Sequence, residues 1–187
     1  TIVDQNDLCK KYNFSSLISE ADTEKAIGII KQLIADGHYF TNSPRYQTNV
    51  NLFGLQDPIW LKFRMSFLMS VFMYLGREAK VSEMMAWSYM TNLDTQENRD
   101  VYWHTHNTNQ WRQKMSGVMY LHIPDDVENY DLAGTEFAPN GVEGDGKYFV
   151  RPAHLTWSIF PGTAWHRPGI VQSHKYRFVI AADVEYQ

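Results

Sequence analysis

The first third of the chain carries apolar positions at the spacing of amphipathic helices. Asp22 is a helix-capping residue type followed by apolar side chains at helical intervals, and Gly37 stands where a left-handed residue often ends a helix. A second helix is predicted to begin at Asp57-Pro58, with proline at the first helical position, and to end near Leu75-Gly76. The sequence therefore predicts two helices within residues 1–79.

The second of these helices is apolar on more than one face. One row of residues, which includes Phe63 and Phe67, recurs at helical spacing. A second row consists of methionines spaced four residues apart: Met65, Met69 and Met73. A methionine row can serve as an adaptable surface for a partner, but filling a core is the more common use, so we expect this row to be buried.

After Lys80 the periodicity changes from helical to alternating. Five short segments are rich in aromatic and β-branched residues and are separated by Gly, Pro, Asn and Asp: Ala86–Met90, Val101–His106, Met115–Ile123, Leu155–Phe160 and Tyr176–Val184. The glycine-rich residues 140–146 lack the Gly-Lys-Ser/Thr of a phosphate-binding loop and are interpreted as a turn. Two helices followed by many strands predict an antiparallel sandwich or barrel buttressed by helices.

Length, charge and composition limit the class of protein. The length of 187 residues predicts one domain, 1–187. Within it we expect residues 1–79 to form a helical buttress and residues 80–187 to form the β core. A hydrophobic fraction of 44% is enough to bury a core without disulfides. A net charge of -4 provides no basic surplus for nucleic acid or an anionic membrane. The most apolar stretch, Ile59 to Leu75, contains charged residues and predicts no membrane span. No secretory signal is evident, so we expect a cytoplasmic protein, and its oligomeric state stays open.

Histidine is the metal-ligating residue that the composition favours. The single cysteine, Cys9, excludes an internal disulfide framework and a cysteine-based metal site. Six of the seven histidines lie in the C-terminal half: His104, His106, His122, His154, His166 and His174. Imidazole is therefore the expected ligand of any transition metal in this chain.

The segment Val101–His106 contains a His-x-His pair. In a strand, residues two apart point to the same face, so His104 and His106 could share one metal ion. The alternative is a pair of histidines that hydrogen-bond to their neighbours. A third histidine, His166, follows a strand and a Pro-Gly corner, so that it is a candidate to join the pair.

Arg177 begins an alternating, largely apolar strand. A buried guanidinium without a partner is costly, so this position predicts an anion nearby, and the fork of arginine matches a carboxylate. The alternative is a structural salt bridge, with Asp183 or Glu136 as the acidic partner.

Together these residues resemble the Fe(II)/2-oxoglutarate-dependent oxygenase superfamily, and most closely its small, poorly characterised members. The resemblance spans residues 84–184 and rests on an ordered series: Trp87, His104-Thr105-His106, Ser116-Gly117-Val118-Met119-Tyr120-Leu121, Gly134-Thr135-Glu136-Phe137-Ala138-Pro139, Phe160-Pro161, His166 and Arg177. It implies a mainly β protein whose core, preceded by the two helices, is a double-stranded β-helix, or jelly roll, that holds Fe(II) and takes 2-oxoglutarate as co-substrate. The activity it implies is a dioxygenase that hydroxylates a substrate and releases succinate and CO2.

The resemblance also assigns residues to the site. His104 or His106 would match the proximal histidine of the family and His166 the distal one. Arg177 would bind the far carboxylate of 2-oxoglutarate, and Tyr120 stands where the family often places a hydroxyl against that group; Tyr120 could also be an ordinary core aromatic.

The third ligand departs from the family pattern of two histidines and one carboxylate. The position that normally holds Asp or Glu is His106. Three histidines could bind the metal, a carboxylate from elsewhere could complete the site, with Glu136 and Asp94 as the first candidates, or only two protein ligands could be present. We favour three ligands: His104, His106 and His166.

The sequence does not identify the substrate, which could be a small molecule or a peptide. Two other functional classes stay open. A cupin-type metal dioxygenase or isomerase often uses three histidines, but its usual glutamate is absent, because Gln110 stands four residues after His106. A non-catalytic jelly-roll binding module would use its histidines structurally. Of the remaining histidines, His122 is expected beside Tyr120, while His154 and His174 are expected to be structural or solvated.

Overall fold

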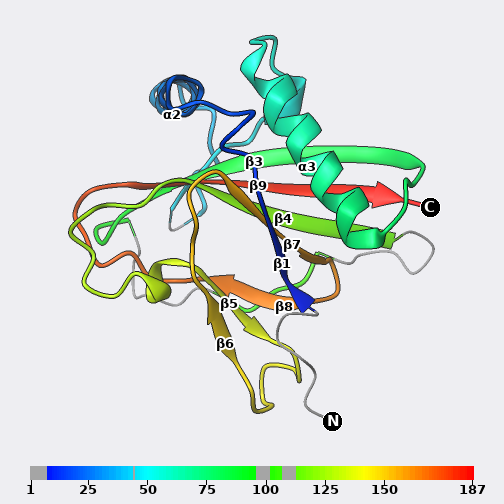
Figure 1. Ribbon diagram of the computed structural model, residues 1–187. Coiled ribbons are helices and arrows are strands. Elements are labelled where there is room, and N and C mark those ends of the chain that lie inside the picture. The colour runs from blue at the N-terminus through cyan, green and yellow to red at the C-terminus, as the bar shows by residue number, and fades with distance from the viewer. Residues whose placement is uncertain (1–7, 44, 96–101, 107–112) are drawn as a thin grey trace.

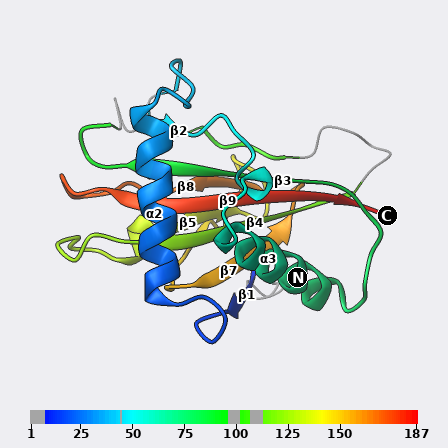
Figure 2. The same ribbon diagram turned by 90° about the horizontal axis from the view of Figure 1, so that it is seen from above.

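The structure is a computed structural model that describes residues 8–43, 45–95, 102–106 and 113–187. Its centre is a six-stranded antiparallel sheet. Helices α2 (Glu20–Ala35) and α3 (Ile59–Leu75) cover one face of this sheet, and a three-stranded sheet lies on the other side (Figure 1). Seen from above, α2 crosses the strands (Figure 2). The molecule is thus mainly β with two helices, which confirms that part of the predicted fold class.

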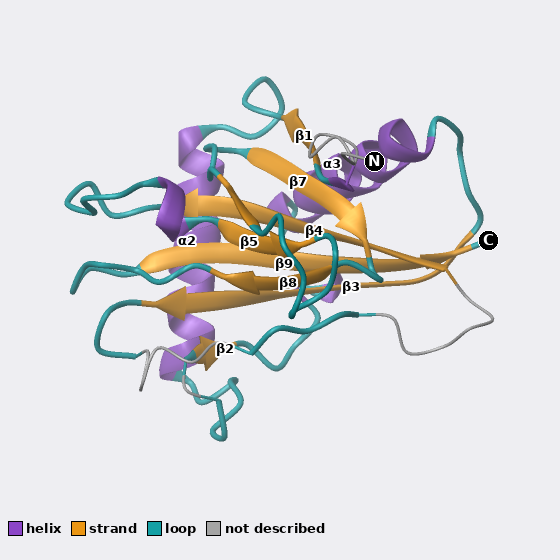
Figure 3. Ribbon diagram, turned by 90° about the horizontal axis from the view of Figure 1, so that it is seen from below, coloured by secondary structure: helices purple, strands orange, loops and turns teal. Residues whose placement is uncertain are grey.

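The large sheet combines strands that are distant in sequence. Its order is β1 (Lys10–Asn13), β7 (Thr156–Pro161), β4 (Gln113–His122), β9 (Arg177–Tyr186), β3 (Val81–Thr91) and β2 (Tyr46–Gln47). The small sheet has the order β6 (Tyr148–Val150), β5 (Thr135–Ala138) and β8 (Trp165–Pro168). Seen from below, β5 and β8 lie over the strands of the large sheet (Figure 3). Short 3-10 turns occur at Leu52–Gly54 (η1) and Asp131–Ala133 (η3).

The predicted strands are confirmed where the alternation is long. β3, β4, β7 and β9 coincide with four of the five predicted segments. The fifth is wrong as a strand over its described residues, because residues 102–106 contain only one isolated bridge, between His104 and His166, and residue 101 lies outside the described residues. Residues 1–79 are not only helical either, since β1 and β2 add strands to both edges of the large sheet.

Alternation along the central strands separates two environments. In β9 the even-numbered residues pack under the helices: Phe178, Ile180, Ala182 and Val184. The odd-numbered residues Arg177, Val179 and Ala181 line a hollow on the other side of the sheet. Because β9 pairs with both β3 and β4, this arrangement repeats on its neighbours and gives the sheet one apolar face and one partly polar face.

The helix ends follow capping chemistry, with two corrections. Ser19, not Asp22, caps α2: its side chain accepts a hydrogen bond from the Asp22 amide at 3.1 Å, and the Asp22 carboxylate accepts one from the Ser19 amide at 3.0 Å. At α3 the Asp57 carboxylate accepts from the Ile59 amide and Gly76 ends the helix with φ of 70°, as predicted, but Pro58 occupies the N-cap position and Ile59 is the first helical residue.

Helix α3 packs closely against β4 at Gly117. A Cβ at this position would lie 2.7 Å from a ring carbon of Phe67, so only glycine permits the observed approach. The opposite face of α3 corrects the prediction for its methionines: Met65, Met69 and Met73 are 49%, 48% and 49% exposed. Since this helix is apolar on nearly all sides, its periodicity does not reveal which side is buried. Among the described residues, no helix has the length and apolar character needed to cross a bilayer.

Candidate metal centre

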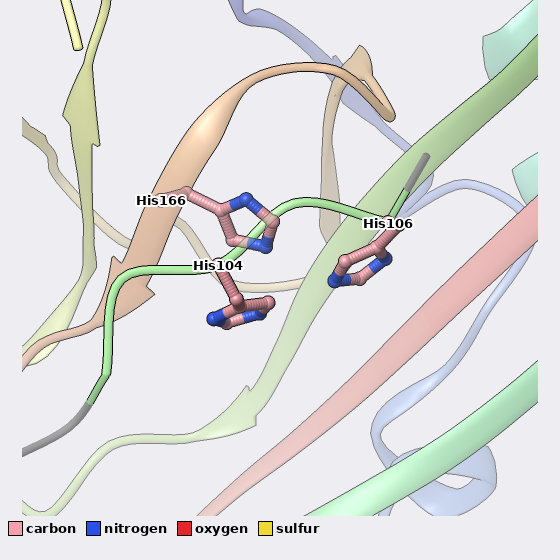
Figure 4. Close-up of side chains that lie close together, drawn as sticks. All are labelled: His104, His106 and His166. Atoms are coloured by element: carbon pink, nitrogen blue, oxygen red, sulfur yellow. The ribbon is translucent and has the colours of Figure 1, made fainter. Parts of the chain in front are cut away.

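Three histidines meet on the polar side of the large sheet. His166 belongs to β8, and its backbone forms a pair of 3.1 Å hydrogen bonds with His104, while the His106 amide donates to the carbonyl of Gly162 at 2.8 Å. These backbone contacts bring one potential ligand atom of each ring to within 4.8 Å of the others. The rings face one another (Figure 4). The structure therefore places the three predicted ligands in a group that could hold one metal ion.

Hydrogen bonds occupy the same ring nitrogen in all three histidines. Nδ1 of His104 lies 3.1 Å from the carbonyl of Tyr102, and Nδ1 of His166 lies 2.9 Å from that of Ala164. Nδ1 of His106 lies 2.7 Å from a carboxylate oxygen of Asp183. Because these partners are acceptors, each Nδ1 carries the proton in the neutral ring and Nε2 keeps its lone pair. This is the state that a metal requires of a histidine ligand.

The surroundings favour neutral imidazole at two of the three rings. Burial, together with the neighbouring rings of His104 and His106, lowers the pKa of His166 to about 3. Burial also lowers the pKa of His104. Both side chains are therefore uncharged at neutral pH and available for coordination.

Asp183 is the carboxylate beside the cluster, and the sequence interpretation did not give it that role. Its Oδ1 accepts hydrogen bonds from His106 and, at 2.6 Å, from the hydroxyl of Ser116. Alternation along β9 places Asp183 on the same side as Arg177, but its contact with a histidine 77 residues away is visible only in the fold. The two carboxylates considered first lie elsewhere: Glu136 binds Arg167 at 3.1 Å and Asp94 binds His174 at 3.0 Å.

Arg177 lies in the same hollow and is 1% exposed. Its Nη1 donates to the carbonyls of Ala133 and Gly169 at 2.6 and 3.0 Å, and its Nε has no hydrogen-bond partner. Neither Asp183 nor Glu136 forms an ion pair with it, since both bind other residues. Burial lowers the pKa of Arg177 to about 10, so the guanidinium stays charged at neutral pH.

Tyr120 lies close to Arg177 and also lines the hollow. Its hydroxyl hydrogen-bonds to that of Thr135, and it is almost fully buried. Burial raises the pKa of Tyr120, which keeps the hydroxyl protonated and able to donate. The structure thus brings both predicted co-substrate residues to the hollow that the histidines line.

The hollow is rich in donors that lack acceptors. Three of its lining residues contain a buried N–H group without a hydrogen-bond partner in the described part of the chain: Arg45, Trp87 and Arg177. Its apolar walls include Val118, Val179 and Ala181. The free volume is about 40 Å³, room for about three water molecules. The donor set matches an anionic ligand. Arg45 and Tyr89, which also line the hollow, were not found from the sequence.

The remaining histidines lie away from the cluster. His122 is exposed, because the register between β4 and β9 shifts after Tyr120, so it does not share the tyrosine's environment. His154 is bonded to Glu20 at 2.7 Å and His174 is exposed, as expected.

Three further tryptophans do not line the hollow. Trp157 belongs to the core under the helices, where its ring N–H donates to Ser66. Trp165 is exposed, and Trp103 lies against the guanidinium of Arg167. Trp111 lies outside the described residues.

Solved structures with similar folds include a prolyl-4-hydroxylase and an α-ketoglutarate-dependent epimerase. AviO1 from Streptomyces viridochromogenes Tue57 matches with a TM-score of 0.66 at 10% identity, covering 97% of this chain and 91% of that one. A prolyl-4-hydroxylase from Pseudomonas putida matches with 0.62 at 9% identity, covering 96% and 92%. SnoN, a non-haem α-ketoglutarate-dependent epimerase from nogalamycin biosynthesis, matches with 0.70 at 8% identity, covering 96% and 77%.

SnoN has also been solved with Fe3+ and α-ketoglutarate, the latter being another name for 2-oxoglutarate. No protein-family model matches the chain, and no curated protein sequence is detectably similar to it. At these identities the similarity is one of fold. The chain shares its fold with prolyl hydroxylases and with an α-ketoglutarate-dependent epimerase, which confirms the resemblance at the level of fold.

Proposed function

We propose that this chain is an Fe(II)- and 2-oxoglutarate-dependent dioxygenase that hydroxylates its substrate and releases succinate and CO2. In this proposal residues 1–187 form one domain, and the two facing sheets constitute a double-stranded β-helix around the metal. The observation that carries it is the pairing of three imidazoles, each with a free Nε2, with a buried arginine that has no carboxylate partner among the described residues.

Each residue of the cluster has a specific part in binding the metal. Nε2 of His104, His106 and His166 would coordinate Fe(II), because Nδ1 is occupied in each ring. Three neutral ligands leave the centre one charge more positive than two histidines and a carboxylate would. Asp183 compensates in part, since its negative charge lies one hydrogen bond from the metal ligand His106 and holds that ring in place.

The co-substrate residues account for the buried donors. Arg177 and Tyr120 would bind the far carboxylate of 2-oxoglutarate, which gives the unpartnered Nε of Arg177 an acceptor. Iron with bound 2-oxoglutarate supplies the oxidising chemistry, through reduction of O2 coupled to loss of CO2. The chain binds and orients these groups, and the apolar residues Val118, Val179 and Ala181 keep water from them.

Because the hollow measures about 40 Å³, we expect a lining side chain to move when 2-oxoglutarate enters. Arg45 is the lining group best able to do so, since the guanidinium forms no hydrogen bond within the part of the chain that the structure describes.

The test is anaerobic titration of the full chain with Fe(II) and then with 2-oxoglutarate, monitored by the weak visible band of the chelated complex. Pyruvate is the matched control ligand, because it has the same chelating 2-oxo acid but lacks the carboxylate assigned to Arg177. We expect the band to form with 2-oxoglutarate at lower concentration than with pyruvate, and succinate to be released on admission of air. A protein that binds Fe(II) but shows no band with 2-oxoglutarate would contradict the proposal.

A cupin-type metal dioxygenase is the second candidate, and the three-histidine cluster is the observation that favours it. Such an enzyme needs no 2-oxo acid, so it leaves the buried Arg177 without a ligand. Equal binding of pyruvate and 2-oxoglutarate, or turnover that does not consume 2-oxoglutarate, would favour this candidate over the first.

A further inference from the structure

A second arginine, Arg45, is partly buried and lies where the histidine hollow meets a larger cavity. Arg45 directly precedes β2, whose residue Gln47 pairs with Tyr89 of β3. The side chain lines both the hollow with the three histidines and a second cavity of about 530 Å³. The other residues that line this second cavity are mostly polar: Tyr39, Thr41, Asn42, Ser43, Tyr46, Asp94 and Thr95.

The charge of Arg45 has no anionic partner among residues 8–43, 45–95, 102–106 and 113–187. Its guanidinium carbon lies 4.7 Å from the centre of the Tyr89 ring, and its Nε is buried without a hydrogen bond. The acidic residue of the larger cavity, Asp94, is bound to His174. Partial burial also lowers the pKa of Arg45. An aromatic ring offsets only part of this desolvation, so the position calls for an anion.

The co-substrate does not provide that anion. In the proposed function one carboxylate of 2-oxoglutarate binds the metal and the other binds Arg177. Arg45 and Arg177 each carry a positive charge, and the field of Arg45 contributes to the lowered pKa of Arg177. When both carboxylates of 2-oxoglutarate are used, Arg45 is still a cation without a counter-charge.

We propose that the substrate of this enzyme carries a carboxylate, which Arg45 binds at the junction between the metal hollow and the larger cavity. This inference rests on the proposed function and adds a substrate class to it. A singly charged carboxylate suits the cavity better than a phosphate, because Arg45 is the one cation among the described residues that line it and Asp94 is also there. The hydroxyl and amide side chains of Thr41, Asn42 and Ser43 suit a polar body attached to that carboxylate.

The test compares acids with their own amides. The full chain is loaded with Co(II) and saturating 2-oxoglutarate, and N-acetyl amino acids and the matching N-acetyl amino acid amides are titrated by calorimetry. We expect wild-type protein to bind the acids at least about tenfold more tightly than the amides. Arg45→Gln, which is polar but uncharged, should remove this preference, and Arg45→Lys should retain part of it, because it keeps the charge without the fork.

Controls separate this inference from the proposed function. Arg77→Gln removes an exposed arginine that also lies over an aromatic ring, and should keep the full acid preference. Thermal melting of each variant shows that it is folded. The inference is overturned if wild-type protein does not distinguish acids from amides, if Arg45→Gln keeps the preference, or if Arg45→Gln loses the 2-oxoglutarate band, which would assign Arg45 to the co-substrate. If the wild-type protein forms no visible band with Fe(II) and 2-oxoglutarate, the proposed function is overturned. If acids nevertheless bind the metal-free wild-type protein and not metal-free Arg45→Gln, the anion site at Arg45 is retained.

Discussion

The two faces of the large sheet differ although the same strands build both. On the helix side, β4 and β9 contribute apolar residues such as Met119 and Ile180 to a closely packed core. On the other side, the same strands contribute Ser116, Arg177 and Asp183, all largely removed from water. Burial of apolar side chains stabilises a fold, whereas burial of polar ones costs free energy unless partners are supplied.

This difference indicates that the helix side stabilises the fold and that the histidine side binds ligands. On the helix side, Ser66 accepts a hydrogen bond from the Trp157 ring, and the ring N–H of Trp60 is the one buried donor of α3 that lacks a partner among the described residues. On the histidine side, donors of Arg45, Trp87 and Arg177 stay unpartnered. Substitutions on the helix side should therefore change stability, and those on the histidine side should change ligand binding.

The largest effect is expected from His166→Ala. This change removes one of three metal ligands from the centre of the cluster, so we expect Fe(II) affinity, measured anaerobically by competition with a chromophoric chelator, to fall by more than about 100-fold. The matched control on the opposite face is Ile180→Val, which should lower the free energy of unfolding by about 0.5–1.5 kcal/mol and leave metal affinity unchanged. Unaltered metal binding in His166→Ala would place the metal elsewhere.

Arg177→Gln should weaken 2-oxoglutarate binding by roughly 30-fold or more, because it removes a desolvated charge from its carboxylate partner. Fe(II) binding should persist, since the three histidines are intact. The visible band of the chelated complex measures 2-oxoglutarate binding, and competition with a chromophoric chelator measures Fe(II) binding. Arg151→Gln, an exposed arginine paired with Asp131, is the control. If 2-oxoglutarate binds Arg177→Gln as it binds the wild type, Arg177 is a structural residue.

Asp183→Asn keeps the shape of the side chain but removes the charge beside His106. We expect about tenfold weaker metal binding, the lower end of the effect of such partners on metal ligands. Asp125→Asn, which removes an exposed carboxylate bonded to Lys175, should leave the affinity unchanged. Equal affinities for the two variants would contradict the role given to Asp183.

Gly117→Ala tests the apolar face. The new Cβ would lie 2.7 Å from the ring of Phe67, and α3 must shift to accommodate it. We expect the free energy of unfolding to fall by about 1–3 kcal/mol in denaturant titrations, with metal affinity within twofold of the wild type. A large loss of metal binding at unchanged stability would show that the two faces are not separable.

The last prediction concerns the pH dependence of the stability of the metal-free protein. His166 has a folded-state pKa of about 3, below its ordinary value of 6.5, so the unfolded chain binds the proton first as the pH falls. Stability should therefore decrease as the pH is lowered through the window between these values, by at most about 1.4 kcal/mol per pH unit from this group. His166→Gln should reduce the slope and the exposed His174→Gln should not, as denaturant titrations at several pH values would show. The same slope in His166→Gln would refute the assignment.

The sequence predicts those helices and strands in which the periodic spacing of apolar residues extends over many positions. The alternating pattern predicts strand β9, and the Asp57-Pro58 pair predicts the start of α3 to within one residue, because each signal depends on residues close in sequence. Met65 on α3 was placed wrongly, since a helix that is apolar all round does not identify its buried side. The short strands of the small sheet carry too few residues for a period to emerge.

The candidate site was only partly accessible to sequence interpretation. The His-x-His pair, His166 and Arg177 were identified by residue type and order, although the pair does not lie in a regular strand. Asp183 and Arg45 were missed as site residues, because their places depend on strand pairings between segments far apart in the chain.

The most direct test of the metal centre is an anomalous-scattering map from anaerobic crystals of the full chain grown with Fe(II) and 2-oxoglutarate. We predict a single strong peak within about 2.3 Å of Nε2 of His104, His106 and His166, with a carboxylate of 2-oxoglutarate against Arg177. A peak bound by two of these histidines and another ligand, or no peak at the cluster, would contradict the three-histidine assignment.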